Sequence, residues 1–272
     1  MVTTREIMDI ALRLVDFESE PADSAIHVSG KTIKKILFGI DADVSELQLA
    51  QQFGYDAVIS HHPKGDCAVT NFHQVFRRHI QQMVNAGVPE HEAKIAVARK
   101  MKALELEMHT RNYRHAVDVA RLLKIPYMNI HTPLDELGRR IMTKKIAQNV
   151  DEGSTVDDVV SALSELPEFR NAKTKIEIRL GDAADLAGKT IVSHGAGTNG
   201  GYEIARKYFE HGTNTLIYIH VNAIDLEKLE ADGAGNLIVT GHIASDSVGI
   251  NPLIRELESR DVSVRSLGII PS

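Results

Sequence analysis

Five short apolar runs, each ending near a histidine or an aspartate, constrain the fold of this chain more than any other feature of its sequence. They are KKILFGID, DAVISHHP, IPYMNIH, NTLIYIHV and NLIVTGH. Apolar residues in these runs do not alternate with polar ones, which is typical of strands that a parallel sheet buries on both faces. Helical patterns such as VSELQLAQQFG and YEIARKYFEHG separate the runs, so we expect right-handed strand–helix–strand units. The sequence therefore predicts an α/β fold.

The predicted elements fall into two related α/β lobes with largely parallel, buried strands. A change of composition near AQNVDEGSTVDDV predicts a boundary at about residue 150. Residues 1–150 would form the first lobe and residues 151–272 the second. Within the first lobe, residues from about 72 to 124 have an almost wholly helical pattern, which predicts a helical insertion.

Charge and hydropathy exclude several classes of protein. The formal net charge of −6 argues against a dedicated nucleic-acid binder, which would carry a basic face. No apolar run reaches the ~20 residues that cross a bilayer. The first residues have helical spacing, with Thr3 or Thr4 as the cap, and lack the pattern of a signal peptide. The single cysteine, Cys67, cannot form an intramolecular disulfide. We expect a cytoplasmic protein that has no membrane partner.

Side chains that can bind metal follow the predicted carboxyl ends of the strands, where parallel sheets bind their ligands. They are His61, His62, His131, Asp135, His220, His242 and Asp246. Imidazole together with carboxylate suits zinc, iron, nickel or manganese better than calcium. If the chain turns helical after His242, positions 242 and 246 share one face, so both side chains can reach the same ion. The sequence thus predicts a divalent-metal site.

Three motifs follow one another along the chain: His-His-Pro at residues 61–63, His-Thr-x-Leu-Asp at residues 131–135, and Gly-His-x-x-x-acid at residues 241–246. In this order they resemble the NIF-three-like family, also called the YbgI-like or GTP cyclohydrolase I type 2 family. The resemblance covers most of the chain, except the helical stretch of about residues 72 to 115. It implies an assembly of several copies, with a ring such as a hexamer as the expected form.

The resemblance also implies a site for two divalent ions to which both lobes contribute. Carried over by position, the ligands would be His61, His62, Asp135, His242 and Asp246. The family normally has a glutamate at the last of these positions, and an aspartate is one methylene shorter. His131 and His220 would orient ligands or transfer protons, because imidazole titrates near neutral pH.

These observations predict a metal-dependent, hydrolase-like protein that acts on an unidentified small metabolite through a metal-activated water. The GTP cyclohydrolase reaction is implied by the family name alone. A carrier of metal, or a regulatory scaffold without catalysis, is the alternative from another class. A dinuclear phosphoesterase of another fold is a third interpretation, although the Asp-x-His start of such enzymes is missing.

Two further patterns carry less information. Gly195, Gly197 and Gly200 match the dinucleotide fingerprint, but no acidic residue ends the next strand, so a small-anion site is the better interpretation. Five histidines of the helical insertion share no single ligand face, and we expect them at solvated or interface positions. They are His73, His79, His91, His109 and His115.

Overall fold

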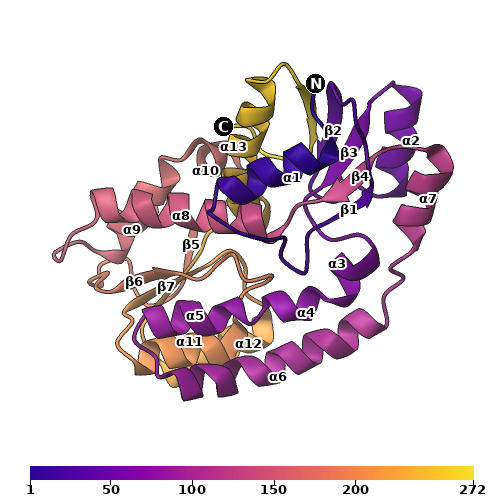
Figure 1. The fold of residues 1–272 in the computed structure, drawn as a ribbon. Coiled ribbons are helices and arrows are strands. Elements are labelled where there is room, and N and C mark those ends of the chain that lie inside the picture. The colour runs from indigo at the N-terminus through magenta and orange to yellow at the C-terminus, as the bar shows by residue number, and fades with distance from the viewer. The chain divides into compact units, whose positions relative to one another are not determined.

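The computed structural model describes residues 1–272 and is a mixed α/β protein with two sheets of mostly parallel strands (Figure 1). The chain divides into two compact units. Unit 1 contains Met1–Val75, Ala103–Leu137 and Gly249–Ile269, and unit 2 contains Phe76–Lys102, Gly138–Val248 and Ile270–Ser272. The predicted fold class, two α/β parts with largely parallel strands, is confirmed.

The sheet of unit 1 has five strands in the order β1-β4-β3-β2-β9. Their bounds are Ala25–Val28, Tyr127–Asn129, Ala57–Ser60, Lys35–Gly39 and Ser263–Leu267. The strands β4, β3, β2 and β9 are parallel, and β1 is antiparallel to β4. The edge strand β9 comes from the end of the chain, although its partner β2 lies near the beginning.

Helices cover both faces of this sheet. Successive side chains of a strand point to opposite faces, so each apolar strand packs with helices on both sides. On one face, Ile36 and Phe38 pack with α1 (Thr4–Arg13) and the later part of α13 (His242–Glu258). On the other face, Leu37 packs with α2 (Val44–Gln52) and α7 (His115–Leu123). The strands are thus buried on both sides, as their unbroken apolar runs predict.

The sheet of unit 2 has the order β5-β8-β7-β6. The bounds are Glu177–Leu180, Asn236–Val239, Thr215–Tyr218 and Thr190–Val192. The strands β8, β7 and β6 are parallel, and β5 is antiparallel to β8. One core of unit 2 joins β6, β7 and β8 with α8 (Thr132–Asn149), α9 (Val156–Ser164) and α10 (Pro167–Asn171). The helix α11 (Gly201–Glu210) packs with α12 (Ala223–Asp232) and α5 (Arg78–Asn85).

The predicted helical insertion, residues of about 72 to 124, is mainly helical, with short turns and loops between its helices. It consists of α4 (Phe72–Val75), α5, α6 (Glu90–His109) and α7, and the short helix α3 (Asp66–Thr70) precedes it. Local sequence signals account for other helix ends, because Thr3 and Thr155 each form a capping box with the acidic residue three positions later. Residues 132–135 read as a turn after a strand when only the sequence is considered, but they are helical. These residues are the first turn of α8.

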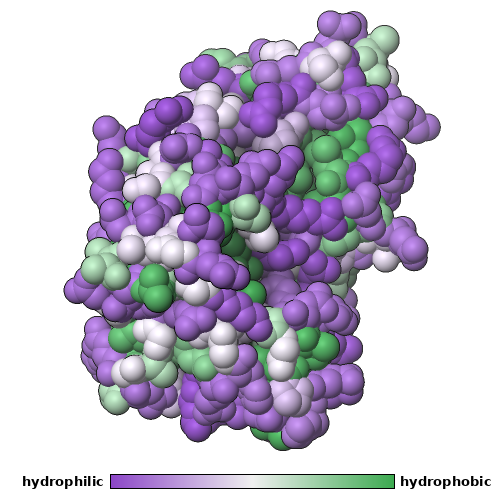
Figure 2. Space-filling view, turned by 90° about the vertical axis from the view of Figure 1, so that its left-hand side faces the viewer, coloured by the Kyte–Doolittle hydropathy of each residue, from purple (hydrophilic) through white to green (hydrophobic).

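Many apolar side chains are buried in these cores. The face drawn in Figure 2 is mostly hydrophilic, with hydrophobic residues in scattered patches. No helix has both the length and the apolar character needed to cross a membrane.

Candidate metal centre

The paired histidines lie where β3 leaves the sheet. The backbone N–H groups of His61 and His62 still donate to the carbonyl oxygens of Gly39, the last residue of β2, and of Ile40, the next residue, with N–O distances of 2.9 Å. Beyond this point the strand ends, so the two side chains are no longer forced to opposite faces. Their ring centroids lie 5.1 Å apart. The end of the strand therefore brings neighbouring imidazoles together, as the sequence predicts.

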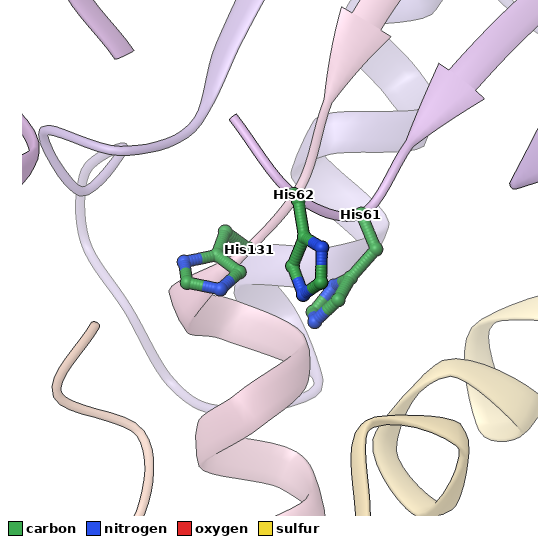
Figure 3. Close-up of side chains that lie close together, drawn as sticks. All are labelled: His61, His62 and His131. Atoms are coloured by element: carbon green, nitrogen blue, oxygen red, sulfur yellow. The ribbon is translucent and has the colours of Figure 1, made fainter. Parts of the chain in front are cut away.

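A third imidazole joins this pair from the junction between β4 and α8. The ring centroid of His131 lies 4.9 Å from that of His61 and 5.6 Å from that of His62 (Figure 3). Because α8 begins at Thr132, Asp135 lies one turn from His131 on the same face. Its carboxylate oxygens lie 3.1 Å from His61 Nε2 and 3.5 Å from His131 Nε2. Three imidazoles and one carboxylate thus converge within unit 1.

All three rings hold the same ring nitrogen, Nδ1, against an acceptor. The acceptors are the Ile130 carbonyl oxygen for His61 (3.0 Å), an Asp41 carboxylate oxygen for His62 (2.9 Å) and an Asp23 carboxylate oxygen for His131 (2.7 Å). A carbonyl or ionised carboxylate only accepts, so Nδ1 carries the proton and Nε2 carries the lone pair. Metal-bound histidines are commonly oriented in this way through their second nitrogen.

The donor set fits a divalent cation of the zinc, iron, manganese or nickel class. One candidate ligand nitrogen from each of His61, His62 and His131 lies within 4.8 Å of the others. His61, His131 and Asp135 are buried, and His62 is half-buried. A set of lone-pair donors held together by burial is what a metal site requires, so the structure contains a candidate metal-ligand cluster.

Electrostatics around the cluster follow from its carboxylates. Hydrogen bonds from His62 and then Lys64 hold the pKa of Asp41 well below its usual range. Burial by itself would lower the pKa of His131, but the negative charges of Asp135 and Asp23 outweigh burial and raise that pKa. In both cases the shifted pKa belongs to one member of a carboxylate–imidazole pair in direct contact.

The remaining predicted site residues come together in unit 2. His242 and Asp246 are the first and fifth residues of α13, and His242 Nε2 lies 3.4 Å from Asp246 Oδ2. The chain does turn helical at His242, as the i, i+4 interpretation requires. His220, just after β7, has its ring centroid 4.8 Å from that of His242. The structure therefore brings this second set of candidates together.

His220 differs from His131 in its titration. Burial, and then the neighbouring charge of His242, lower the pKa of His220 to about 4. The amide nitrogen of Asn199 lies 2.7 Å from His220 Nδ1. At neutral pH His220 is therefore uncharged. Asn199 lies in the glycine loop, and no signal in the sequence linked it to the site.

The glycine loop after β6 is held by side chains of α5. The carbonyl oxygens of Gly195 and Thr198 accept from Arg78 Nε (2.7 Å) and His79 Nε2 (2.8 Å), and that of His194 accepts from Gln82. His79 is fully buried, so the expectation of a solvated or interface position is wrong for this histidine. Side chains of α5, which belongs to the insertion, therefore fix the backbone of the glycine loop within unit 2.

A separate cluster of two glutamates and a histidine also has the spacing of metal ligands, but its residues form an ion-pair network. It contains Glu92, Glu210 and His211. The ammonium group of Lys207 lies between the two carboxylates, 2.7 Å from Glu92 and 2.6 Å from Glu210. A cation is already supplied by the protein, so we assign no metal site there.

Asp23 is the residue that the sequence reasoning missed in unit 1. It lies in the loop that precedes β1, has no exposed surface, and is 108 residues from His131 along the chain. Neither periodicity nor a motif marks it. Only the pairing of β1 with β4 brings this loop to the end of β4.

Several solved structures have a fold similar to that of this chain. A NIF3 superfamily protein from Sphaerobacter thermophilus is 46% identical, with 98% of each chain covered and a TM-score of 0.96. The fold also matches reduced HcgD from Methanocaldococcus jannaschii (15% identity, 98% and 99% coverage, TM-score 0.61) and the protein ybgI (16%, 100% and 99%, TM-score 0.55). No family model and no curated protein matches the chain. At 46% identity over nearly the full length, the chain belongs to the NIF3 superfamily.

Proposed function

We propose that this chain binds divalent metal ions, about two per chain, and uses them to hydrolyse a small metabolite. One observation carries the proposal. Three imidazoles, each with Nδ1 held by an acceptor, direct Nε2 toward one another next to the buried carboxylate of Asp135. Rings that served only as structural polar groups would not need to share this orientation.

The proposed ligands are His61, His62 and Asp135 in unit 1, and His242 and Asp246 in unit 2. The support for the second pair is its chemistry and its position. An imidazole and a carboxylate share one face at the start of α13, and Asp246 is buried with only 1% of its surface exposed. Imidazole and carboxylate are both ligands of the same class of divalent cation. The experiment below tests the contribution of each unit separately.

A divalent ion, when bound, would polarise the substrate and lower the pKa of a coordinated water. The chain itself would supply the proton transfer. His131 Nε2 has the lone pair that can accept a proton, and the raised pKa of His131 favours its protonated form afterwards. His220 is neutral and half-buried, which suits a hydrogen-bonding role toward the substrate. We name His131 and His220 as the candidate catalytic residues.

Metal content tests the first half of the proposal. The wild-type protein, loaded with zinc or manganese and then desalted, should contain about two ions per chain by elemental analysis. Asp135→Asn and His242→Ala should each lower that content. His115→Ala, which removes an exposed histidine at the start of α7, should not. Equal metal content in all four proteins would refute the site.

Turnover tests the second half. Metal-loaded protein should hydrolyse a member of a panel of nucleotides, phosphoesters and cyclic amides, and His131→Gln should abolish that activity. Retained metal without any turnover would refute the hydrolase. Rapid loss of the ions to a chelator would then favour the carrier. We also propose a ring-shaped homo-oligomer, for which light scattering after gel filtration should give several times the 30.0 kDa chain mass.

A further inference from the structure

A carboxylate outside the proposed ligand set controls His131. Asp23 Oδ2 lies 2.7 Å from His131 Nδ1 and also accepts from Thr132 Oγ1 at 2.7 Å. Its other oxygen, Oδ1, accepts from Ser24 Oγ at 3.4 Å. With no surface exposed, this carboxylate has three protein donors around it. All three groups can donate, so both oxygens of this carboxylate act as acceptors.

The same loop also fixes the backbone next to the imidazole. Ser24 Oγ accepts from the backbone N–H of His131 at 3.0 Å. The side-chain amide of Asn129 donates to the Asp23 carbonyl oxygen at 2.6 Å, and the Asn129 oxygen accepts from His27 Nε2 at 3.1 Å. The loop is therefore anchored to the end of β4 by bonds that do not involve the Asp23 carboxylate. Removing that carboxylate should leave the anchor in place.

We propose that Asp23 is a positioning residue that locks His131 in the Nδ1–H tautomer. With the proton on Nδ1, Nε2 keeps its lone pair and lies 3.5 Å from Asp135 Oδ2. The other tautomer would place an N–H group at the cluster, where the proposed reaction needs a base. The tautomer claim stands on the hydrogen bonds alone, and only its catalytic consequence rests on the proposed function.

Nitrogen NMR reads the tautomer directly. In chelator-treated, ¹⁵N-labelled protein at a pH above the raised pKa of His131, where the ring is neutral, His131 should show a pyrrole-type Nδ1 and a pyridine-type Nε2, with the assignment taken from signals lost in His131→Gln. Asp23→Ala should remove this signature and populate the Nε2–H form. Asp23→Asn should restore it, because the amide oxygen can still accept from Nδ1–H. Thr132→Val, a near-isosteric control at the same carboxylate oxygen, should keep the wild-type pattern.

The outcomes separate this inference from the proposed function. A wild-type pattern in Asp23→Ala that is correctly folded by circular dichroism would overturn the positioning role. So would a mixture of tautomers in the wild-type protein. If the tautomer changes as expected and the protein proves to be a hydrolase, Asp23→Ala should lose about 10- to 100-fold in turnover, the usual range for residues that orient such a histidine. A changed tautomer in a protein without turnover would support the inference and refute the hydrolase.

Discussion

The buried His79 should make the stability of this protein depend on pH. Its imidazole lies inside unit 2, where Nε2 donates to the Thr198 carbonyl oxygen at 2.8 Å. Burial lowers the pKa of His79 to about 4, the bond to Thr198 opposes that shift, and the positive charges of Lys100, Arg78 and His194 add to it. In the unfolded chain the same histidine titrates near 6.5.

The difference sets the sign and the size of the effect. Below pH 6.5 the unfolded chain binds a proton that folded His79 refuses, so the free energy of unfolding falls as the pH falls. The loss begins near pH 6.5 and levels off below about pH 4. At about 1.4 kcal/mol for each pH unit, the full contribution of His79 is about 3 kcal/mol.

Urea unfolding of the wild-type protein and His79→Gln, from about pH 7.5 to about pH 4.5, measures this contribution. Glutamine can place an N–H group near the position of Nε2, so the bond to Thr198 is retained while the titration is removed. The variant should lose less stability on acidification. His91→Gln, at an exposed position on α6, should follow the wild-type curve. Identical pH dependence in His79→Gln and the wild type would refute this reasoning. His220 also has a lowered pKa, but both proteins contain it, so its contribution is the same in both curves.

Four further outcomes are expected. Thr155→Ala removes the capping box of α9 and should cost about 0.5–2 kcal/mol in urea unfolding. Leu253→Ala opens a cavity in the core between α13 and the first sheet and should cost about 2–5 kcal/mol by the same assay. Gly235→Ala should lower the melting temperature, because φ is +73° and a Cβ atom would lie 2.3 Å from Phe209. Zinc or manganese at about 100 times its Kd should stabilise the wild type by about 2.7 kcal/mol, and Asp135→Asn should lose that gain.

The strand ends were predictable because two independent patterns coincide there. Unbroken apolar runs locate the strands, and metal-binding side chains follow directly after them, as at His61 and His62. The first turn of α13 was also within reach, since the four-residue gap between His242 and Asp246 matches the helical period. These signals consist of residues close together in the chain, so a single sequence is enough to reveal them.

The features that could not be predicted depend on contacts between residues that lie far apart in the sequence. The strand β1 has only four residues in a polar stretch, so no run marks it. Without β1, nothing indicates that Asp23 meets His131. The burial of His79 has the same cause, because a helix with a polar pattern packs against a glycine loop that lies far along the chain. The start of α8 was missed because Thr132-Pro133 reads equally well as a turn or as a first helical turn.

The first sheet is complete only when β9 has been synthesised, because this strand follows all the others along the chain and pairs with β2. Until residues 263–267 have left the exit tunnel, β2 presents unpaired N–H and C=O groups along the flank where β9 will bind. An open flank of this kind recruits other strands. A nascent chain therefore keeps this flank of β2 open to pairing with other strands until β9 has been made.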